Sequence, residues 1–218
     1  LLESGQWTSL RARPYGRVAD PAVRPHSIFV TAMDTNPLAP DIAAVADGQG
    51  ASFDRGLAAI SLLTEGPIFV CSGPEFPLAV PTNEQIRHEV FEGVHPAGTV
   101  GLHIHTLDAV TRGKVVWHIG LQDVLSTGRL FETGQLDVGR VVSIGGPPVI
   151  KPRLIRTRIG AAVASLMDGE INDVQDIRVI SGSVLSGRRA EGDVHGFLGR
   201  YHQQVSVLVE GRTREFLG

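Results

Sequence analysis

Two apolar runs in the first half of the chain have the pattern of buried strands. Residues 27–33 and 67–71 are short, rich in β-branched side chains and bounded by turn residues. Between them, the apolar side chains of residues 53–63 repeat with helical spacing, after Ser52 as an N-cap and before Gly66 as a helix stop. This strand–helix–strand order predicts a βαβ unit, in which helices pack on a parallel sheet.

Weaker patterns of the same kinds fill the rest of the first half. Turn-forming residues predict loops, and short apolar periodicities predict further helices and strands. The expected loops are residues 11–17, 34–37 and 73–81, the expected helices are 1–10, 83–88 and 121–130, and the expected strands are 100–106, 114–119 and 140–144. We expect the last of these strands to close the first half.

The run Gly145-Gly146-Pro147-Pro148 interrupts the periodicity and predicts a domain boundary. Beyond it the pattern predicts a small α+β unit, with a helix over 161–167 and strands over 154–159, 178–185, 204–209 and 213–216, the last two forming a hairpin around a glycine turn. The expected organisation is therefore an α/β domain over residues 1–146 and an α+β domain over residues 147–218.

Composition narrows the class of protein. Of 218 residues, 42% are hydrophobic and 20% charged, which excludes a disordered chain. No apolar run reaches the roughly 18 residues of a membrane span. A net charge of −3 gives no basic footprint for nucleic acid, and the single cysteine, Cys71, excludes an internal disulfide. Because the chain starts without a methionine and stops just after an expected strand, we expect it to be a piece of a longer polypeptide.

Histidines are the first candidates for chemistry. On the expected strand over 100–106, His103 and His105 would point to the same face, with His95 nearby. Two imidazoles are potential zinc or iron ligands, but Asp108 is the nearest carboxylate and no cysteine completes a set. The metal site is therefore a weak prediction, and hydrogen-bonded structural histidines are the alternative.

Other catalytic signatures are absent from the sequence. Neither G-x-G-x-x-G, nor G-x-x-x-x-G-K-[ST], nor the G-x-S-x-G elbow occurs. Cys71 lies inside an expected strand, where a thiol behaves as a small apolar side chain. Nucleotide-binding and hydrolase motifs therefore give no support for those activities.

Two polar segments are candidate binding sites. Arg11, Arg13 and Arg17 surround Tyr15 just before the first long strand; arginines suit anionic or carbonyl-bearing ligands, and tyrosine offers an aromatic surface. The alternative is an ordinary exposed basic loop. The second segment, Asp34-Thr35-Asn36, follows the carboxyl end of the first strand, where parallel α/β sheets bind ligands. Its alternative is a simple polar turn.

Several long and unusual strings together resemble one known family, the A subunit of the Na⁺-translocating NADH:quinone oxidoreductase. They are residues 30–39 (VTAMDTNPLA), 95–98 (HPAG), 102–105 (LHIH), 116–119 (VWHI), 122–124 (QDV), 179–187 (VISGSVLSG) and 198–208 (LGRYHQQVSVL). The strings occur in order over the whole chain. The resemblance implies a fragment without the family's N-terminal lipoyl-like domain and C-terminal region.

The resemblance also implies a fold and a setting. It implies a Rossmann-like domain similar to the flavin-binding subunit of complex I, followed by a ubiquitin-like (β-grasp, SLBB-type) domain. In such a complex, NADH is oxidised, flavins and an iron–sulfur centre carry electrons to ubiquinone, and Na⁺ is exported. The implied position is peripheral, on the cytoplasmic side of the bacterial inner membrane, with the other subunits as partners. We expect the isolated fragment to be inactive.

Flavin binding is expected to be degenerate. The flavin-phosphate loop of the relatives matches residues 6–17, where bulky side chains replace the glycines that close approach to a phosphate requires. Asp34, Thr35 and Asn36 would remain as a vestigial flavin crevice, with no cofactor bound tightly. We expect any quinone contact at Arg11, Arg13, Tyr15 and Arg17. The alternatives are a docking module without a small-molecule site, and retained flavin or nucleotide binding near Asp34.

Overall fold

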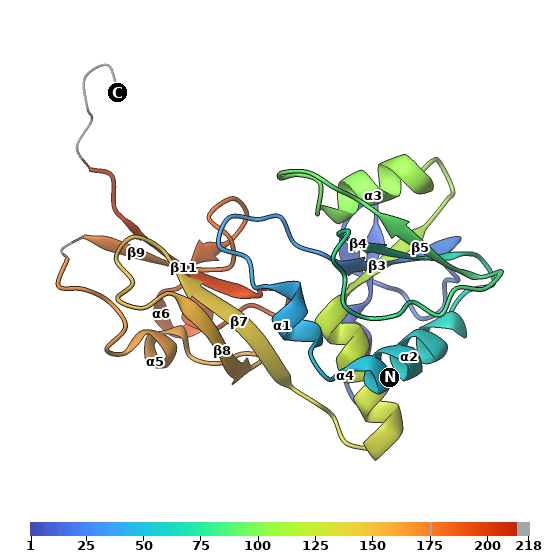
Figure 1. Cartoon of the computed structure of the whole chain (residues 1–218), viewed down its shortest axis with the longest axis horizontal. Helices are drawn as coiled ribbons and strands as arrows, with labels where there is room; N and C mark the ends of the chain where they lie inside the picture. The colour runs from blue at the N-terminus through green and yellow to red at the C-terminus, as the bar shows by residue number, and fades with distance from the viewer. Residues whose placement is uncertain (175, 213–218) are drawn as a thin grey trace. The chain divides into compact units, whose positions relative to one another are not determined.

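The chain forms two units, each built on its own β-sheet, in a computed structural model that describes residues 1–174 and 176–212 (Figure 1). The first unit contains residues 1–36 and 41–138, and the second contains residues 37–40 and the chain from Gly139 onward. The strand expected over 140–144 does not close the first half. It belongs to the second sheet, so the units divide before this strand rather than after Gly146.

The first sheet has a parallel core, as the βαβ pattern predicted. Its strands are β1 (Arg11–Arg13), β2 (Arg17–Val18), β3 (Ser27–Ala32), β4 (Ile68–Ser72), β5 (Ile86–Val90) and β6 (Val116–Gly120). Their order is β2-β1-β6-β3-β4-β5, with β6, β3, β4 and β5 parallel. Strands β1 and β2 form a hairpin that pairs antiparallel with β6.

Helices cover both faces of this sheet (Figure 1). On one face α2 (Gly50–Ser61) packs along α4 (Leu121–Thr133), and α4 also contacts β3 and β6. On the other face α3 (Val100–Leu107) packs over β3. The 3₁₀ helix η1 (Gln6–Ser9) and the short helix α1 (Ile42–Ala46) complete the helical elements of the unit.

Glycines set the close approach of α2 and α4. A Cβ on Gly128 would lie 1.8 Å from the Ser52 carbonyl oxygen, and one on Gly56 would lie 2.2 Å from the Val124 oxygen. The two helices therefore meet backbone to backbone. Ser52 is buried at this contact inside α2, whose N-cap is Gln49, so the N-cap prediction for Ser52 is wrong.

The alternation of side chains along each strand divides the core into two layers. The α3 layer contains Phe29, Phe69, Cys71, Ile104 and Val116. The neighbouring residues of β3, β4 and β6, including the fully buried Trp117, therefore face the α2–α4 layer.

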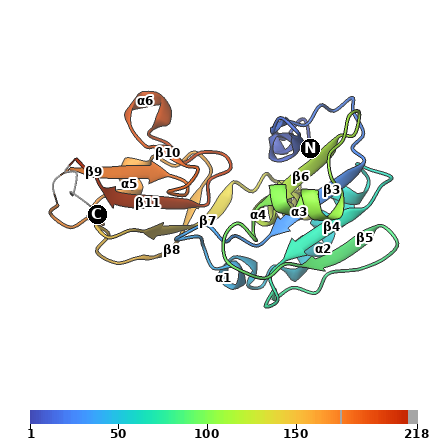
Figure 2. The same cartoon turned by 90° about the horizontal axis from the view of Figure 1, so that it is seen from above.

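The second sheet has the topology of a β-grasp fold. Its strands are β7 (Gly139–Gly145), β8 (Arg153–Arg158), β9 (Ile177–Ser181), β10 (Arg188–Arg189) and β11 (Gln204–Val209), and its helices are α5 (Val163–Met167) and α6 (Gly192–His195). The order is β10-β9-β11-β7-β8, with the last strand, β11, inserted parallel to the first (Figure 2). The predicted ubiquitin-like architecture is confirmed. The strand expected over 213–216 lies outside the described residues.

One face of the second sheet packs on α5, and its apolar core includes Val142, Val205 and Val207. The opposite face, here called the open face, is crossed by residues 37–40, here called the strap. Ser143 donates a hydrogen bond through Oγ to the Leu38 carbonyl, and Gln204 donates through Nε2 to the Pro37 carbonyl over 2.8 Å. Leu38 has a φ of 64°, a left-handed conformation that few side chains of its kind adopt.

Three further local predictions are wrong. Residues 83–88 were expected as a helix but contain the start of β5, an edge strand with a polar sequence. Residues 11–17 were expected as a loop but form the β1–β2 hairpin. Residues 100–106 were expected as a strand but lie in α3, because the buried positions follow helical spacing rather than the alternation of the letters.

Candidate functional site

The basic segment is held as a hairpin by its own side chains. The Arg11 guanidinium donates through Nε and Nη2 to the Gly16 carbonyl at 3.0 and 2.7 Å. Gly16 has a φ of 64°, which favours glycine at this turn. Arg11 therefore closes the hairpin, and Tyr15 at its tip is 82% exposed.

A small pocket of about 240 Å³ opens beside this hairpin. Its walls are mostly apolar, and Arg13, Tyr15 and Arg17 lie among its lining residues. The Arg17 guanidinium carbon lies 5.8 Å from the centre of the Tyr15 ring. Ala12, Val18, Val23, Val115 and Trp117 provide the apolar lining. The structure thus brings together three of the four predicted basic-segment residues and gives Arg11 a supporting position.

Trp117 adds a donor that the sequence did not single out. This side chain is 1% exposed and lines the pocket, and its ring meets the Trp7 ring edge to face at 5.6 Å. Trp7 donates its own indole N–H to the Ala19 carbonyl at 2.7 Å. Within the part of the chain that the structure describes, the Trp117 Nε1 has no hydrogen-bond partner. An unsatisfied buried N–H is unfavourable and is a reason to consider a ligand acceptor.

The reverse face of the same strands is strongly cationic. Arg11 pairs in register with His118, and Arg13 with Val116, so both arginines lie on the α3 face. Burial, together with the charges of Arg11 and Arg13, lowers the pKa of His118 to about 3. His118 is therefore neutral near pH 7. A Cβ on Gly101 of α3 would lie 3.7 Å from an Arg13 guanidinium nitrogen, so this side chain reaches toward α3.

The second predicted segment lies at the topological switch point of the first sheet. The chain runs from β3 outward through β4 and β5 and then returns to β6 on the other side of β3. Asp34 accepts hydrogen bonds through Oδ1 from the Asn36 backbone N–H and side-chain amide, at 2.9 and 2.7 Å. Thr35 accepts the Gly98 N–H at 2.9 Å. The turn therefore occupies the expected ligand-binding edge, with its side chains bonded to neighbouring residues.

The two predicted segments lie at opposite edges of the sheet. The hairpin turn follows Arg13, which pairs with Val116 at the start of β6, whereas Gly120 at its end pairs with Thr31 beside the Asp34 turn. Four residues of strand separate these levels by about 13 Å. A single small ligand therefore does not span both.

The histidines do not form a metal site. His103 and His105 lie two residues apart on the helix α3, which directs them to different sides. His103 is fully buried, hydrogen-bonds the Ala97 carbonyl through Nε2 at 2.8 Å, and has its pKa lowered by burial. His105 is exposed. Over residues 1–174 and 176–212, no group of three or more metal-ligating side chains comes together.

The segment matched to a flavin-phosphate loop does not fit a phosphate. The backbone N–H groups of Gly5, Gln6, Trp7 and Thr8 are all hydrogen-bonded to nearby oxygens of the same segment. The Gln6 amide turns inward and donates to the Asp123 carbonyl at 3.1 Å. A phosphate cradle needs free backbone donors, and this segment instead packs on α4.

Two family models match the chain. The model described as NqrA second alpha/beta domain matches residues 1–136, and the model described as NQRA C-terminal domain, of the SLBB type, matches residues 141–192. These matches agree with the predicted α/β and SLBB-type parts. Among the described residues, no helix has the length and apolar character required to cross a membrane.

Similar curated proteins all carry one name, that of the A subunit of the Na(+)-translocating NADH-quinone reductase. Those of Cellvibrio japonicus, Hahella chejuensis and Marinomonas sp. are 51%, 50% and 51% identical over 100% of this chain. The chain spans 48% of the length of each of them. The resemblance found in the sequence is confirmed.

Solved structures share the fold at low identity. Two crystal structures of NAD⁺-reducing NiFe hydrogenase, in the H₂-reduced and air-oxidised states, give TM-scores of 0.57 and 0.59 at 9% and 13% identity. They cover 88% and 97% of this chain, and this chain covers 41% and 46% of theirs. At such identities the likeness concerns the fold alone.

Proposed function

Because the chain belongs to the NqrA family, we propose that it is part of the NqrA subunit of a Na⁺-translocating NADH:quinone reductase. Full-length coverage of the chain at about half identity supports this proposal. The subunit sits at the periphery of the complex, on the cytoplasmic side of the bacterial inner membrane. The complex oxidises NADH, reduces ubiquinone and exports Na⁺, while flavins and the iron–sulfur centre are held by other subunits.

Within that complex, the hairpin pocket receives the quinone head group. A quinone is a flat ring with two carbonyl acceptors, and the pocket combines apolar walls with the Tyr15 ring and N–H donors from Trp117 and Arg17. Its volume of about 240 Å³ suits one ring rather than a dinucleotide. The observation that carries the proposal is the unpartnered, buried Trp117 indole N–H beside this pocket.

The residues of this chain bind and orient the quinone. The Trp117 indole donates to one carbonyl oxygen, and an arginine at the rim donates to the other. Guanidinium groups of Arg13 and Arg17 also favour the negative charge that the quinone acquires on reduction. The electrons and the protons of the two-electron reduction come from outside this chain.

The family-level proposal is tested in the assembled complex. Cells lacking the NqrA subunit are complemented with the full-length NqrA containing this chain, and membranes are assayed for Na⁺-dependent NADH oxidation and Na⁺ uptake. Restoration of both activities is expected. A complex that forms and pumps Na⁺ without NqrA would overturn the proposal.

The pocket is tested by titrating the complete chain with ubiquinone-1 and following tryptophan fluorescence. Trp117→Phe removes one hydrogen bond, and Tyr15→Ala removes the stacking surface, so each is expected to raise the Kd about 5- to 10-fold. Tyr201→Ala is the matched control, because Tyr201 is the only other tyrosine and lies in the second unit. Unchanged affinity in both pocket variants removes the pocket from the quinone site.

The two alternatives give different results in the same preparation. If the chain is only a docking module, ubiquinone-1 shows no saturable binding to the wild type. If flavin binding is retained near Asp34, the purified chain absorbs at flavin wavelengths and loses that absorbance in Asp34→Ala. The segment that should hold the phosphate lacks free backbone donors, which favours the first result over the second.

A further inference from the structure

The two units carry opposite charge. Residues 1–138 contain 15 acidic and 9 basic side chains, whereas residues 139–218 contain 8 acidic and 11 basic ones. The second unit is therefore a cationic body within a chain of net charge −3. Such an excess attracts acidic partners and accelerates their association.

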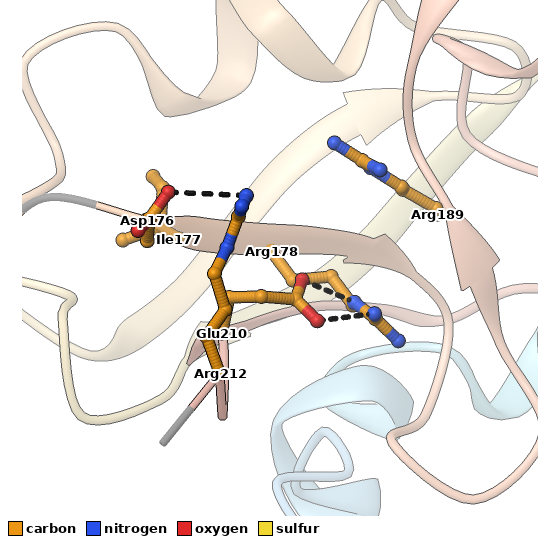
Figure 3. Close-up of a pocket in the computed structure, with 6 residues that line it drawn as sticks. All are labelled: Asp176, Ile177, Arg178, Arg189, Glu210 and Arg212. Carbon is orange, nitrogen blue, oxygen red and sulfur yellow. Dashed lines mark hydrogen bonds and ion pairs between the residues drawn. The ribbon is translucent and has the colours of Figure 1, made fainter.

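Three arginines of this unit gather around one carboxylate in a shallow pocket of about 380 Å³ (Figure 3). Arg178 of β9 holds Glu210 with two guanidinium nitrogens, and Arg212 contacts Asp176 at 3.2 Å. Arg189 of β10 lies at the opposite side of the pocket. Arg178, followed by the charges of Arg189 and Arg212, holds the pKa of Glu210 below its ordinary value.

The cluster lies on the open face of the second sheet. Arg178 pairs in register with Leu208, and Arg189 with Ile180, whereas the residues that alternate with them, Val179 and Val207, belong to the α5 core. Both arginines therefore point away from α5. The strap contacts the part of this face formed by Ser143 and Gln204, and the arginine pocket lies further along β11.

Two of the arginines retain unused donors in a site that is open to solvent. Arg189 uses Nε in its pair with Glu191 at 2.8 Å, and Arg212 uses one Nη in its pair with Asp176. A guanidinium has five N–H donors, so each can bind a further carboxylate. The two side chains are 58% and 73% exposed, which suits contact with a protein surface better than enclosure of a small molecule.

We propose that this arginine pocket docks an acidic segment of another subunit, whose carboxylates enter between Arg189 and Arg212. Charge complementarity with the cationic second unit favours this occupant, and arginine is enriched in protein interfaces. The intramolecular pairs do not prevent docking, because exposed ion pairs are weak and exchange readily. The inference rests on the proposed membership of the complex, and it assigns to the second unit an anchoring role separate from the quinone pocket.

The test is retention of full-length NqrA in the purified complex as KCl is raised. Arg189→Glu with Arg212→Glu is expected to weaken retention at least 10-fold, without changing the thermal unfolding of the chain. The matched control is Arg24→Glu with Arg55→Glu, because these are exposed arginines of the first unit that also hold one carboxylate each. Equal retention of both double variants overturns the docking proposal.

A photo-crosslinker at Leu208 identifies the occupant in the assembled complex. An acid-rich peptide of another subunit is expected, and reversal of its charges to arginine should restore retention of R189E/R212E. A crosslink to lipid, or to a peptide without acidic residues, overturns the proposal. If wild-type NqrA itself fails to join the complex, the family-level function fails instead, so the two failures are distinguishable.

Discussion

The two sheets of this chain differ in how their faces are covered. In the first sheet, α2 and α4 cover one face and α3 covers the other, so ligand access is confined to the edges. In the second sheet, α5 covers one face, and the strap covers only part of the other. As a result, the candidate quinone pocket lies at an edge of the first sheet, while the candidate docking surface lies on a face of the second.

The difference follows from topology. Parallel strands need crossover connections, and these place helices on both faces of the first sheet. The β-grasp sheet is mostly antiparallel and needs one helix, so its other face meets water or another protein. The buried polar side chains Ser143, Gln204 and Ser206 on the open face match this, because the covering segment is backbone rather than an apolar helix.

The largest expected effect is at the closest helix contact of the covered sheet. In Gly128→Ala, the new methyl group would lie 1.8 Å from the Ser52 oxygen, so α2 and α4 must separate. We expect a loss of about 3 kcal/mol in the free energy of unfolding, measured by urea denaturation. Gly50→Ala in α2 is the control, because its methyl group meets nothing within 4 Å and the free energy should change by less than about 1 kcal/mol.

The next effect is a pH dependence that originates in the covered sheet. The pKa of His118 is about 3 in the folded chain against an ordinary 6.5, so the unfolded chain binds the proton first as pH falls. Stability is therefore fully present above about pH 6.5 and is lost toward pH 3, at up to about 1.4 kcal/mol per pH unit. Between pH 6.5 and 4.5 we expect His118→Gln to lose about 2 kcal/mol less than wild type. Parallel unfolding curves for both proteins over this range would contradict the assignment.

The smallest effect concerns the strap on the open face. Gln204→Ala leaves the Pro37 carbonyl without its donor at a position where Gln204 is 2% exposed. A loss of about 1.5 kcal/mol is expected by thermal unfolding. Gln135→Ala, at an exposed position after α4, should change stability by less than about 0.5 kcal/mol. A loss as large as that of Gly128→Ala would mean that the two faces are equally tightly packed.

The sequence predicted the parts of the fold that depend on apolar periodicity. The runs that became β3, β4, β6 and α4 are long enough to be recognised individually. α3 was misread because Leu102-His103-Ile104-His105 alternates in letters, although Val100, His103, Ile104 and Leu107 form a helical stripe. β5 was missed because an edge strand can be polar along most of its length.

The candidate site was predictable only in part. Arg13, Tyr15 and Arg17 could be named because they lie together in the chain. Trp117 and His118 could not, because their proximity to the hairpin depends on the antiparallel register of β1 with β6, about 100 residues away. The arginine pocket has the same origin, since Arg178 and Glu210 are 32 residues apart in sequence.

The strap also imposes an order on synthesis. Pro37 and Leu38 leave the ribosome long before their partners, and the Pro37–Gln204 hydrogen bond joins residues 167 positions apart. The first sheet can be complete once β6 has emerged, whereas the open face of the second cannot be covered until β11 has paired with β7. The second unit therefore matures last, and a fragment beginning at Gly139 would lack the segment that finishes it.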